Sequence, residues 1–403
     1  MCNLQKMDRR AMGVLALSHV ADDLNQSFLP ALLPFLIAAR GLNYTSAATL
    51  ILAANVASSV VQPGIGWLAD RKPLLWVVPV GLLFAGGGVA LVGVAPNYAL
   101  MLAAALLSGL GVAAFHPEAA RLANLVAGER KTSGMRWFAA GGNAGFAIGP
   151  LLAGGAVVTF GLSGSLIAFV PVALMAGLLA LELPRLHGLA PARRATRAAG
   201  ERDDVAAFAR LSLFVILRSM AFLGLVGFVP LYFVSVLHAP APVASLALTV
   251  LLASGVLGTL AGGPVADRYG RRFVLIASTG ASALLMAAFV AATVRGLPLV
   301  LAIVAVGIIG FTLVASQASY VVLGQEFLPN RMGLASGVTL GLAVSLGGIA
   351  SPALGRIADV HGLPATMSAL SALCALAFVA AIGVPERRSQ RHVASRATAG
   401  AAN

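Results

Sequence analysis

The sequence GWLADRK at residues 66–72 returns as GPVADRYGRR at residues 263–272, an offset of 263 minus 66, or 197 positions. A second feature repeats at nearly the same offset: Gly149-Pro150 matches Ser351-Pro352, 202 positions later. Two matched features at nearly one offset indicate an internal duplication. The sequence therefore predicts a chain built from two similar halves.

The composition excludes a soluble protein. Of the 403 residues, 27 are Lys or Arg and 14 are Asp or Glu, while 59% are hydrophobic and the mean hydropathy is +0.93. A soluble chain is about a quarter charged, whereas this one is 10% charged. The two cysteines, Cys2 and Cys374, form neither a disulfide framework nor a CxxC metal site.

Long apolar runs predict an all-α membrane protein. A spanning helix needs about 20 mostly apolar residues, and the chain contains twelve runs of that kind. The runs cover residues 11–38, 47–68, 74–95, 98–126, 134–160, 164–183, 206–237, 243–266, 272–294, 298–324, 333–357 and 364–384. We therefore expect twelve transmembrane helices in two pseudo-symmetric six-helix halves, at residues 1–183 and 206–385, with a linker at 184–205 and a basic tail at 386–403.

The positive charges predict the orientation of the chain. If the N-terminus is cytoplasmic, Arg40, Arg295 and Arg356 face the opposite side and Arg121 and Arg218 lie inside helices, which leaves 22 of the 27 Lys and Arg facing the cytoplasm. Cytoplasmic loops carry an excess of Lys and Arg. Both termini are thus expected in the cytoplasm and the helices in a bacterial-type inner membrane. This asymmetry accounts for the net charge of +13, so nucleic-acid binding is not expected.

The repeated loops have the composition of a gate between helices. Glycine permits close helix approach, Asp can face a neighbouring helix N-terminus, and Arg can pair with acids across an interface. The candidate gating residues are Gly66, Asp70, Arg71, Gly263, Asp267, Arg268, Gly270 and Arg271. The alternative is that such loops only anchor the topology. Both loops resemble the helix 2–3 signature of the major facilitator superfamily, Gly-x-x-x-Asp-Arg-x-Gly-Arg; the second copy is complete, and the first departs at Lys72-Pro73.

Four further stretches narrow this resemblance. They are SHVADDLNQSFLPALLPFL at 18–36, FHPEAARLA at 115–123, GGNAGFAIGPLLAG at 141–154 and GQEFLPNRMGLASG at 324–337. Together they resemble the fosmidomycin-resistance branch, which consists of proton-coupled exporters of small molecules. The resemblance implies a monomeric drug/proton antiporter that works by alternating access and contributes to antibiotic resistance, with a small-molecule substrate, protons and lipid as partners and no cofactor.

The fifth run carries a glycine pattern with two interpretations. Gly145-x-x-x-Gly149-Pro150 resembles part of the antiporter motif of the same superfamily, although Arg136 stands where the longer pattern has glycine. Glycines four residues apart are also a general device for close helix packing, and proline kinks helices of any function. Both interpretations remain open at the level of the sequence.

Charged residues inside the apolar runs are the candidate functional groups. An Asp, Arg or Lys at mid-helix costs about 2.5–3.5 kcal/mol on insertion scales, so it needs a partner, water or a function. The five such residues are Asp22, Asp23, Glu118, Arg121 and Arg218. His19 and Gln26 share one broad helical face with the two aspartates. This group forms a coupled titrating cluster of the kind that proton coupling requires, unless the acids serve only to pair with arginines of other helices.

The fourth run adds His116, Glu118 and Arg121. Pro117 removes a backbone hydrogen bond beside His116, and Glu118 and Arg121 can pair within one helix, although Arg121 could instead snorkel to the interface. The predicted proton-coupling residues are therefore Asp22, Asp23, His19, Glu118 and His116. A metal site is not expected, because His116 and Glu118 are two positions apart and point to different helix faces.

Arg218 is predicted to face a central cavity. It lies about 15 Å into its helix, where it either neutralises a carboxylate of the first half or binds an anionic substrate. The predicted substrate-binding residues are Gln26, Arg121, Arg218, Asn143, Gln317 and Tyr320. For the uncharged ones, the alternative is an ordinary hydrogen bond between helices.

Two other functions fit the same residues. The first is a proton-linked uptake symporter on the same fold. The second is an intramembrane enzyme that uses His116, Glu118 and the aspartates as acids and bases. Because no nucleophile stands in a recognisable motif, and because a duplicated half has no evident catalytic use, the chain is not expected to be an enzyme.

Overall fold

The computed structural model describes residues 7–71, 74–127, 131–188, 203–329, 335, 338–339 and 343–386, which form helices and turns but no strand. The first half comprises α1 (Arg9–Arg40), α2 (Tyr44–Arg71), α3 (Val77–Val94), α4 (Tyr98–Val126), α5 (Lys131–Phe160), the 3-10 helix η1 (Gly161–Ala168) and α6 (Phe169–Gly188). The second half comprises α7 (Val205–Ser235), α8 (Ala241–Tyr269), α9 (Arg271–Val294), α10 (Leu299–Val314), α11 (Gln317–Phe327), α13 (Ala343–His361) and α14 (Leu363–Ile382).

The predicted apolar runs all overlap helices of the structure, with one interruption. The tenth run, predicted as one helix over residues 298–324, is divided into α10 and α11 by a turn at Ala315 and Ser316. The backbone tightens there, because Ala315 N–H donates to the carbonyl of Thr312. The Thr312 hydroxyl also hydrogen-bonds the carbonyls of Ile308 and Ile309, a side-chain contact that perturbs the end of a helix.

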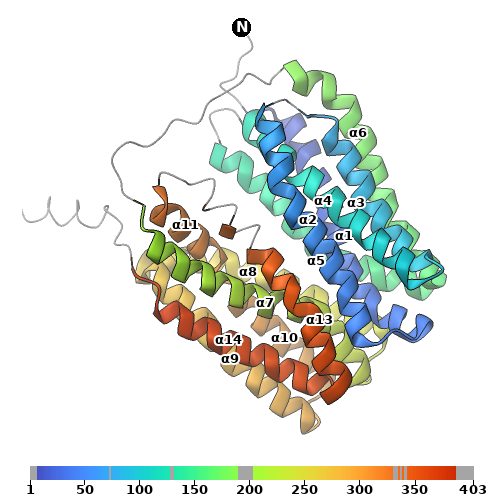
Figure 1. Cartoon of the computed structure of the whole chain (residues 1–403), viewed down its shortest axis with the longest axis vertical. Coiled ribbons are helices and arrows are strands. Elements are labelled where there is room, and N and C mark those ends of the chain that lie inside the picture. Colours follow the sequence, from blue (N-terminus) through green and yellow to red (C-terminus); the bar gives the residue numbers. More distant parts are fainter. Residues whose placement is uncertain are drawn as a thin grey trace, which may run out of the picture.

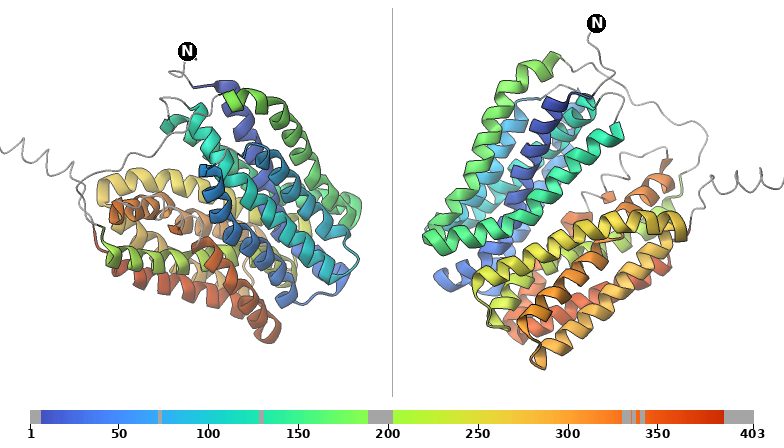
Figure 2. Two further views of the ribbon diagram at one scale, coloured as in Figure 1. Left: turned by 45° about the horizontal axis from the view of Figure 1, so that its top comes forward. Right: turned by 180° about the vertical axis from the view of Figure 1, so that it is seen from behind.

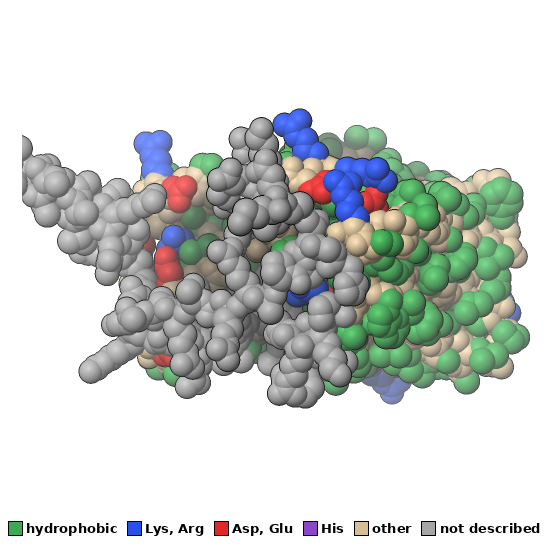
Figure 3. All heavy atoms as spheres, turned by 90° about the horizontal axis from the view of Figure 1, so that it is seen from above, with side chains coloured by type: hydrophobic (Ala, Val, Ile, Leu, Met, Phe, Trp, Pro, Cys, Tyr) green, Lys and Arg blue, Asp and Glu red, His purple; other side chains and the backbone are tan. Residues whose placement is uncertain are grey.

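The surface of the helical bundle suits a membrane. Among the described residues, nine stretches are long and apolar enough to cross a bilayer by length and composition. Many large apolar side chains are exposed, and an apolar surface of this extent suits contact with lipid. Viewed onto the end of the bundle where the N-terminus lies, basic and acidic side chains gather at that end, and the flank beside them is hydrophobic (Figure 3).

In the described part of the chain, the two halves pack as separate bundles that meet mainly along four helix pairs. Figures 1 and 2 show α1–α6 on one side and α7–α14 on the other. Contacts between them run through α1 with α7 and α8, α2 with α13, and α5 with α8. The largest buried apolar cluster crosses this boundary and includes Phe28 of α1 and Phe228 of α7. The halves converge at the end of the bundle opposite the N-terminus (Figure 1).

The boundaries between the halves are only partly described. α6 ends at Gly188 and α7 begins at Val205. Residues 189–202, most of the predicted linker, and the predicted tail from residue 387 onward lie outside the described residues. The domain limits at 183, 205 and 385 therefore stay predictions.

Candidate functional site

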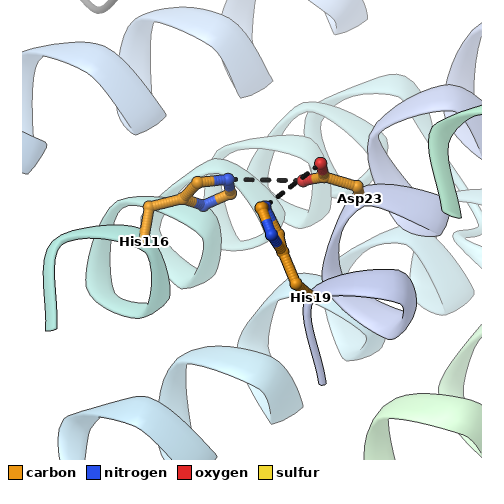
Figure 4. A group of neighbouring side chains, drawn as sticks. All are labelled: His19, Asp23 and His116. Carbon is orange, nitrogen blue, oxygen red and sulfur yellow. Dashed lines mark ion pairs between the residues drawn. The ribbon is translucent and has the colours of Figure 1, made fainter. Parts of the chain in front are cut away.

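Helices α1 and α4 bring two histidines and two aspartates together. Asp23 lies between the imidazoles: its Oδ2 is 3.3 Å from His19 Nε2, and its Oδ1 is 3.3 Å from His116 Nε2. Figure 4 shows both rings directed at this carboxylate. His116 Nδ1 also lies 3.2 Å from Oδ2 of Asp22. Four of the five predicted proton-coupling residues thus form one cluster.

Backbone carbonyls and an aromatic ring orient the two imidazoles. His19 Nδ1 is 2.8 Å from the carbonyl oxygen of Phe138, and the His19 ring stacks on the Phe138 ring with centroids 4.1 Å apart. His116 Nδ1 is 3.2 Å from the carbonyl of Val112, one turn earlier in α4. A ring nitrogen facing a carbonyl acts as the N–H donor, so Nε2 of each ring is left to face Asp23.

The two aspartates have different surroundings. Asp23 accepts a hydrogen bond of 2.6 Å from the Gln26 amide and has both histidines beside it. Asp22 is fully buried, and neither of its oxygens has a hydrogen-bond partner of normal geometry within the described part of the chain, although His116 Nδ1 is at ion-pair distance. Gln26, predicted to contact substrate, therefore holds Asp23 in this structure.

Glu118 and Arg121 form the ion pair that their spacing predicts. Arg121 donates from Nε to Glu118 Oε2 at 2.7 Å and from Nη2 to Oε1 at 2.5 Å, which is a bidentate contact. Glu118 is fully buried, whereas the Arg121 side chain is 30% exposed. Glu118 thus pairs with this arginine, whereas His116 lies at ion-pair distance from the two aspartates.

Glycines of α5 allow α1 to approach closely. A Cβ atom added at Gly141, Gly145 or Gly149 would collide with the carbonyl oxygens of Ala16, Val20 and Leu24, respectively. Gly145 and Gly149 thus do what the close-packing interpretation predicts, and the antiporter interpretation stays a prediction.

Gly142 is a contributor that the sequence did not single out. A Cβ atom there would lie 2.6 Å from His19 Nε2 and would collide with Asp23 Oδ2. Its absence of a side chain makes room for the imidazole–carboxylate pair. The quoted stretch GGNAGFAIGPLLAG contains this glycine, but only the helix register shows which glycine of the pair faces His19.

The second half contains a buried guanidinium, that of Arg218. Arg218 of α7 is 3% exposed, donates from Nε to the Leu313 carbonyl at 3.2 Å, and lies over the Phe222 and Tyr320 rings at 5.1 and 5.6 Å. Its Nη2 has no hydrogen-bond partner, and no carboxylate of the described residues lies at ion-pair distance. The hydroxyls of Ser316 and Ser319 are also buried, with no hydrogen-bond partner among the described residues.

The remaining predicted substrate residues are less closely associated. Tyr320 is buried beside Arg218. Asn143 is exposed on α5, and Gln317, which is partly buried, begins α11. The structure thus associates Tyr320 with Arg218, whereas the roles of Asn143 and Gln317 stay predictions.

The repeated loops are described in part. Gly66, Asp70 and Arg71 belong to α2, but their side chains lie outside the described part of the chain. In the second copy, Gly270 has a φ of +92°, a conformation that favours glycine, and separates α8 from α9. Gly263 and Asp267 lie on α8, and Arg268 lies over the Tyr269 ring.

Arg271 pairs with an acid of its own half. Its Nη1 lies 2.7 Å from Glu326 Oε1, which joins the start of α9 to α11. In this conformation the contact holds helices of the second half together.

Comparison with known proteins identifies the family. The sequence model of the Major Facilitator Superfamily matches residues 15–352. The chain belongs to the Major Facilitator Superfamily. This result confirms the resemblance carried by the repeated loops and makes the chain a multi-pass membrane protein of a transporter family.

Two relatives share most of the length of this superfamily member. It is 32% identical over 376 residues to an uncharacterized MFS-type transporter, YfnC, of Bacillus subtilis, with 91% of each chain covered. It is 30% identical over 357 residues to a fosmidomycin resistance protein of Escherichia coli, with 86% of each chain covered. The narrower resemblance to the fosmidomycin-resistance branch is therefore confirmed.

Solved structures show the same fold at low sequence identity. A bacterial homologue of the human lysosomal transporter Spinster, in an inward-facing and occupied conformation, superposes with a TM-score of 0.76 at 15% identity, covering 93% of this chain and 96% of that one. The nucleoside transporter NupG gives 0.76 at 16% identity, covering 95% and 99%. At these identities the likeness shows the fold alone, which is the major facilitator fold.

Proposed function

We propose that this transporter exports a small anionic drug-like molecule or metabolite in exchange for protons. The proposal rests on two groups of buried ionisable side chains. The first half contains a cluster of His19, Asp22, Asp23 and His116, and the second half contains the guanidinium of Arg218. Buried ionisable groups inside a membrane are costly and mark pathways for ions or substrates. The resistance named for the E. coli relative is what export of a toxic compound would produce.

The first cluster suits proton binding. Its two carboxylates lie beside two imidazoles, so protons can be gained or lost without a lysine or arginine moving. The alternation between two conformations then depends on the protonation state, because uncompensated charge is unfavourable in the membrane interior. Protonation would weaken the ion pairs of this cluster and of Glu118 with Arg121, and thereby favour substrate release on the outer side.

The surroundings of Arg218 suit the binding of an anionic substrate. A buried guanidinium whose Nη2 lacks a partner can donate to a carboxylate or phosphonate oxygen. Two buried hydroxyls, on Ser316 and Ser319, lie at the turn that begins α11, and Tyr320 of that helix contacts Arg218. We place substrate at this turn, with Arg121 as a second cation if Glu118 becomes protonated.

The proposed orientation of the protein in the membrane follows from the uneven distribution of Lys and Arg. With both termini in the cytoplasm of a bacterial-type cell, the halves converge on the outer side and the structure represents an inward-facing conformation. The Spinster homologue with a similar fold was solved in an inward-facing conformation, which supports this assignment.

A compound screen followed by vesicle transport tests the proposal. Cells expressing the protein are grown against a panel of toxic anions, fosmidomycin included, and the protected compound is then assayed in everted vesicles. We expect proton-driven accumulation inside these vesicles, collapsing with a protonophore. A protein that confers no resistance in such a panel would count against drug export.

The same assay separates export from uptake. Arg218 gives a physical reason to consider a symporter, because an anion and a proton moving together nearly cancel in charge. A symporter would accumulate its substrate in right-side-out vesicles with an inward proton gradient, and would not do so in everted ones.

Asp359 of α13 gives a prediction about the closed end of the bundle. Its Oδ1 accepts the Tyr44 N–H at 2.8 Å and its Oδ2 accepts the N–H and the hydroxyl of Thr45, so it caps α2 of the other half. Partial burial favours a higher pKa, but the hydrogen bonds from Thr45 and Tyr44 and the charge of Arg356 outweigh it and hold the pKa of Asp359 below its usual value. The ionised carboxylate therefore stabilises the closed end.

Removing this charge is expected to favour opening. Asp359→Asn should shift the equilibrium toward separation of the two halves by about 1 kcal/mol, or about fivefold. In the wild type, the stabilisation is present above the ordinary pKa of about 4 and is lost as pH falls through the lowered pKa. Distances between spin labels on cysteines introduced at Ala99 and Arg295, both exposed at this end, would report the shift.

Asn43 provides the matched control for Asp359. Its Oδ1 accepts the Ser46 N–H, so it caps the same end of α2 from within the same half. Asn43→Ala should weaken α2 without changing the distance distribution. An unchanged distribution in Asp359→Asn would show that this contact does not hold the halves together.

A further inference from the structure

We propose that His19, Asp23 and His116 bind a divalent transition-metal ion of the Zn²⁺ type. The sequence argues against a metal because His116 and Glu118 point apart. The structure supplies different partners for His116, from α1 instead of α4 (Figure 4). Two imidazoles and one carboxylate are a ligand set that leaves a fourth position open for water or another ligand.

The spacing of the ligand atoms fits a tetrahedral ion. One oxygen of Asp23 lies 3.3 Å from His19 Nε2, the other lies 3.3 Å from His116 Nε2, and one ligand atom from each residue can be chosen within 4.8 Å of the rest. Ligands about 2.0–2.1 Å from Zn²⁺ at tetrahedral angles are about 3.3–3.4 Å from one another. Because the two 3.3 Å distances involve different oxygens of Asp23, the side chains would rotate to bring one ligand atom of each residue to this spacing.

Outer contacts already prepare both imidazoles as ligands. A metal-binding histidine usually donates its other ring N–H to a carbonyl or a carboxylate. His19 Nδ1 faces the Phe138 carbonyl at 2.8 Å, and His116 Nδ1 faces the Val112 carbonyl and Asp22 Oδ2, each at 3.2 Å. The lone pair of each Nε2 is thus directed at the proposed metal position, and Asp22 is the outer carboxylate.

Charge and access favour a cation at this position. Asp22 and Asp23 together carry two negative charges when ionised, and the arginine of α4, Arg121, is bound to Glu118. One divalent ion balances the two carboxylates. The His116 and Asp23 side chains are 24% and 15% exposed, so the position can be reached from outside the packed core.

Metal titration of the purified, tag-free full-length protein tests the proposal without a gradient or substrate. We expect one site for Zn²⁺ by calorimetry, and a visible spectrum of tetrahedral Co²⁺ that Zn²⁺ abolishes. His19→Gln and His116→Gln should each weaken Zn²⁺ binding by at least about tenfold. Zn²⁺ binding that is absent in the wild type, or unchanged in both variants, would overturn the proposal.

Two further variants separate a local site from surface binding or misfolding. His238→Gln and His361→Gln remove described histidines outside the cluster and should leave the Zn²⁺ affinity unchanged. Gly142→Ala removes no ligand, but its Cβ would crowd His19 and Asp23, so it should weaken Zn²⁺ binding. Thermal unfolding measured without metal should show that this variant is still folded. Failure of the transport assays would leave this result intact, because binding is measured separately.

Discussion

Asp22→Asn is expected to abolish proton-driven transport while leaving the fold intact. The substitution keeps the shape of the side chain and removes its ability to take up a proton. Within the described part of the chain, fully buried Asp22 has no hydrogen bond of normal geometry, and its one ion-pair contact is to His116, which Asp23 also holds, so few native contacts are lost. A positioned acid or base contributes about 10²–10⁴-fold to a proton-transfer step. In proteoliposomes we therefore expect at least about a 100-fold loss of uphill transport, with residual downhill flux that no longer depends on the proton gradient.

Asp23→Asn and Glu118→Gln are the control variants for Asp22→Asn. Asp23 holds His19, His116 and Gln26 in place, so its loss should impair both stability and transport. Glu118→Gln should weaken its contact with Arg121 without touching the histidines. If Asp22→Asn and Asp23→Asn both retained wild-type proton-driven transport, the cluster would not be the coupling site, and Glu118 would become the candidate.

The helices and halves were predictable because they depend on local composition. Apolar runs of about 20 residues are recognisable without tertiary information, and the repeated loop at 263–272 marked the boundary between α8 and α9. The division of the tenth run at Ala315 was not predictable in the same way. The turn is accompanied by hydrogen bonds from the Thr312 hydroxyl to its own backbone, and hydropathy does not register such contacts.

The site was predictable as far as helix periodicity reaches. His19 and Asp23 are four residues apart, and the structure pairs them as the spacing predicts. The distance between His116 and Asp23 depends on how α4 packs against α1, which one sequence does not specify. The role of Gly142 could not be predicted for the same reason, because it depends on which face of α5 meets His19.

Arg218→Met is expected to weaken substrate binding while preserving or raising stability. A buried charge without a carboxylate partner carries a desolvation penalty of several kcal/mol, and methionine fills a similar length without charge. A hydrogen bond to a charged group contributes about 1.5–3 kcal/mol, so loss of the guanidinium should reduce the affinity for an anionic substrate by about 10- to 150-fold. Thermal unfolding and binding of the screened substrate would measure the two effects on the same sample.

The expected change in stability on replacing Arg218 distinguishes a substrate-binding residue from a structural one. An arginine that neutralised a carboxylate of the other half would leave that acid uncompensated when removed, and stability would fall by about 3–5 kcal/mol. Tyr320→Phe keeps the ring beside the guanidinium, so stability should not change appreciably, and any loss of substrate affinity would measure the contribution of the Tyr320 hydroxyl alone. Arg218→Lys keeps the charge but not the planar fork, so an intermediate affinity is expected. A sharp loss of stability in Arg218→Met with unchanged substrate affinity would assign Arg218 to the packing of the halves, and the anion site would have to be sought at Arg121.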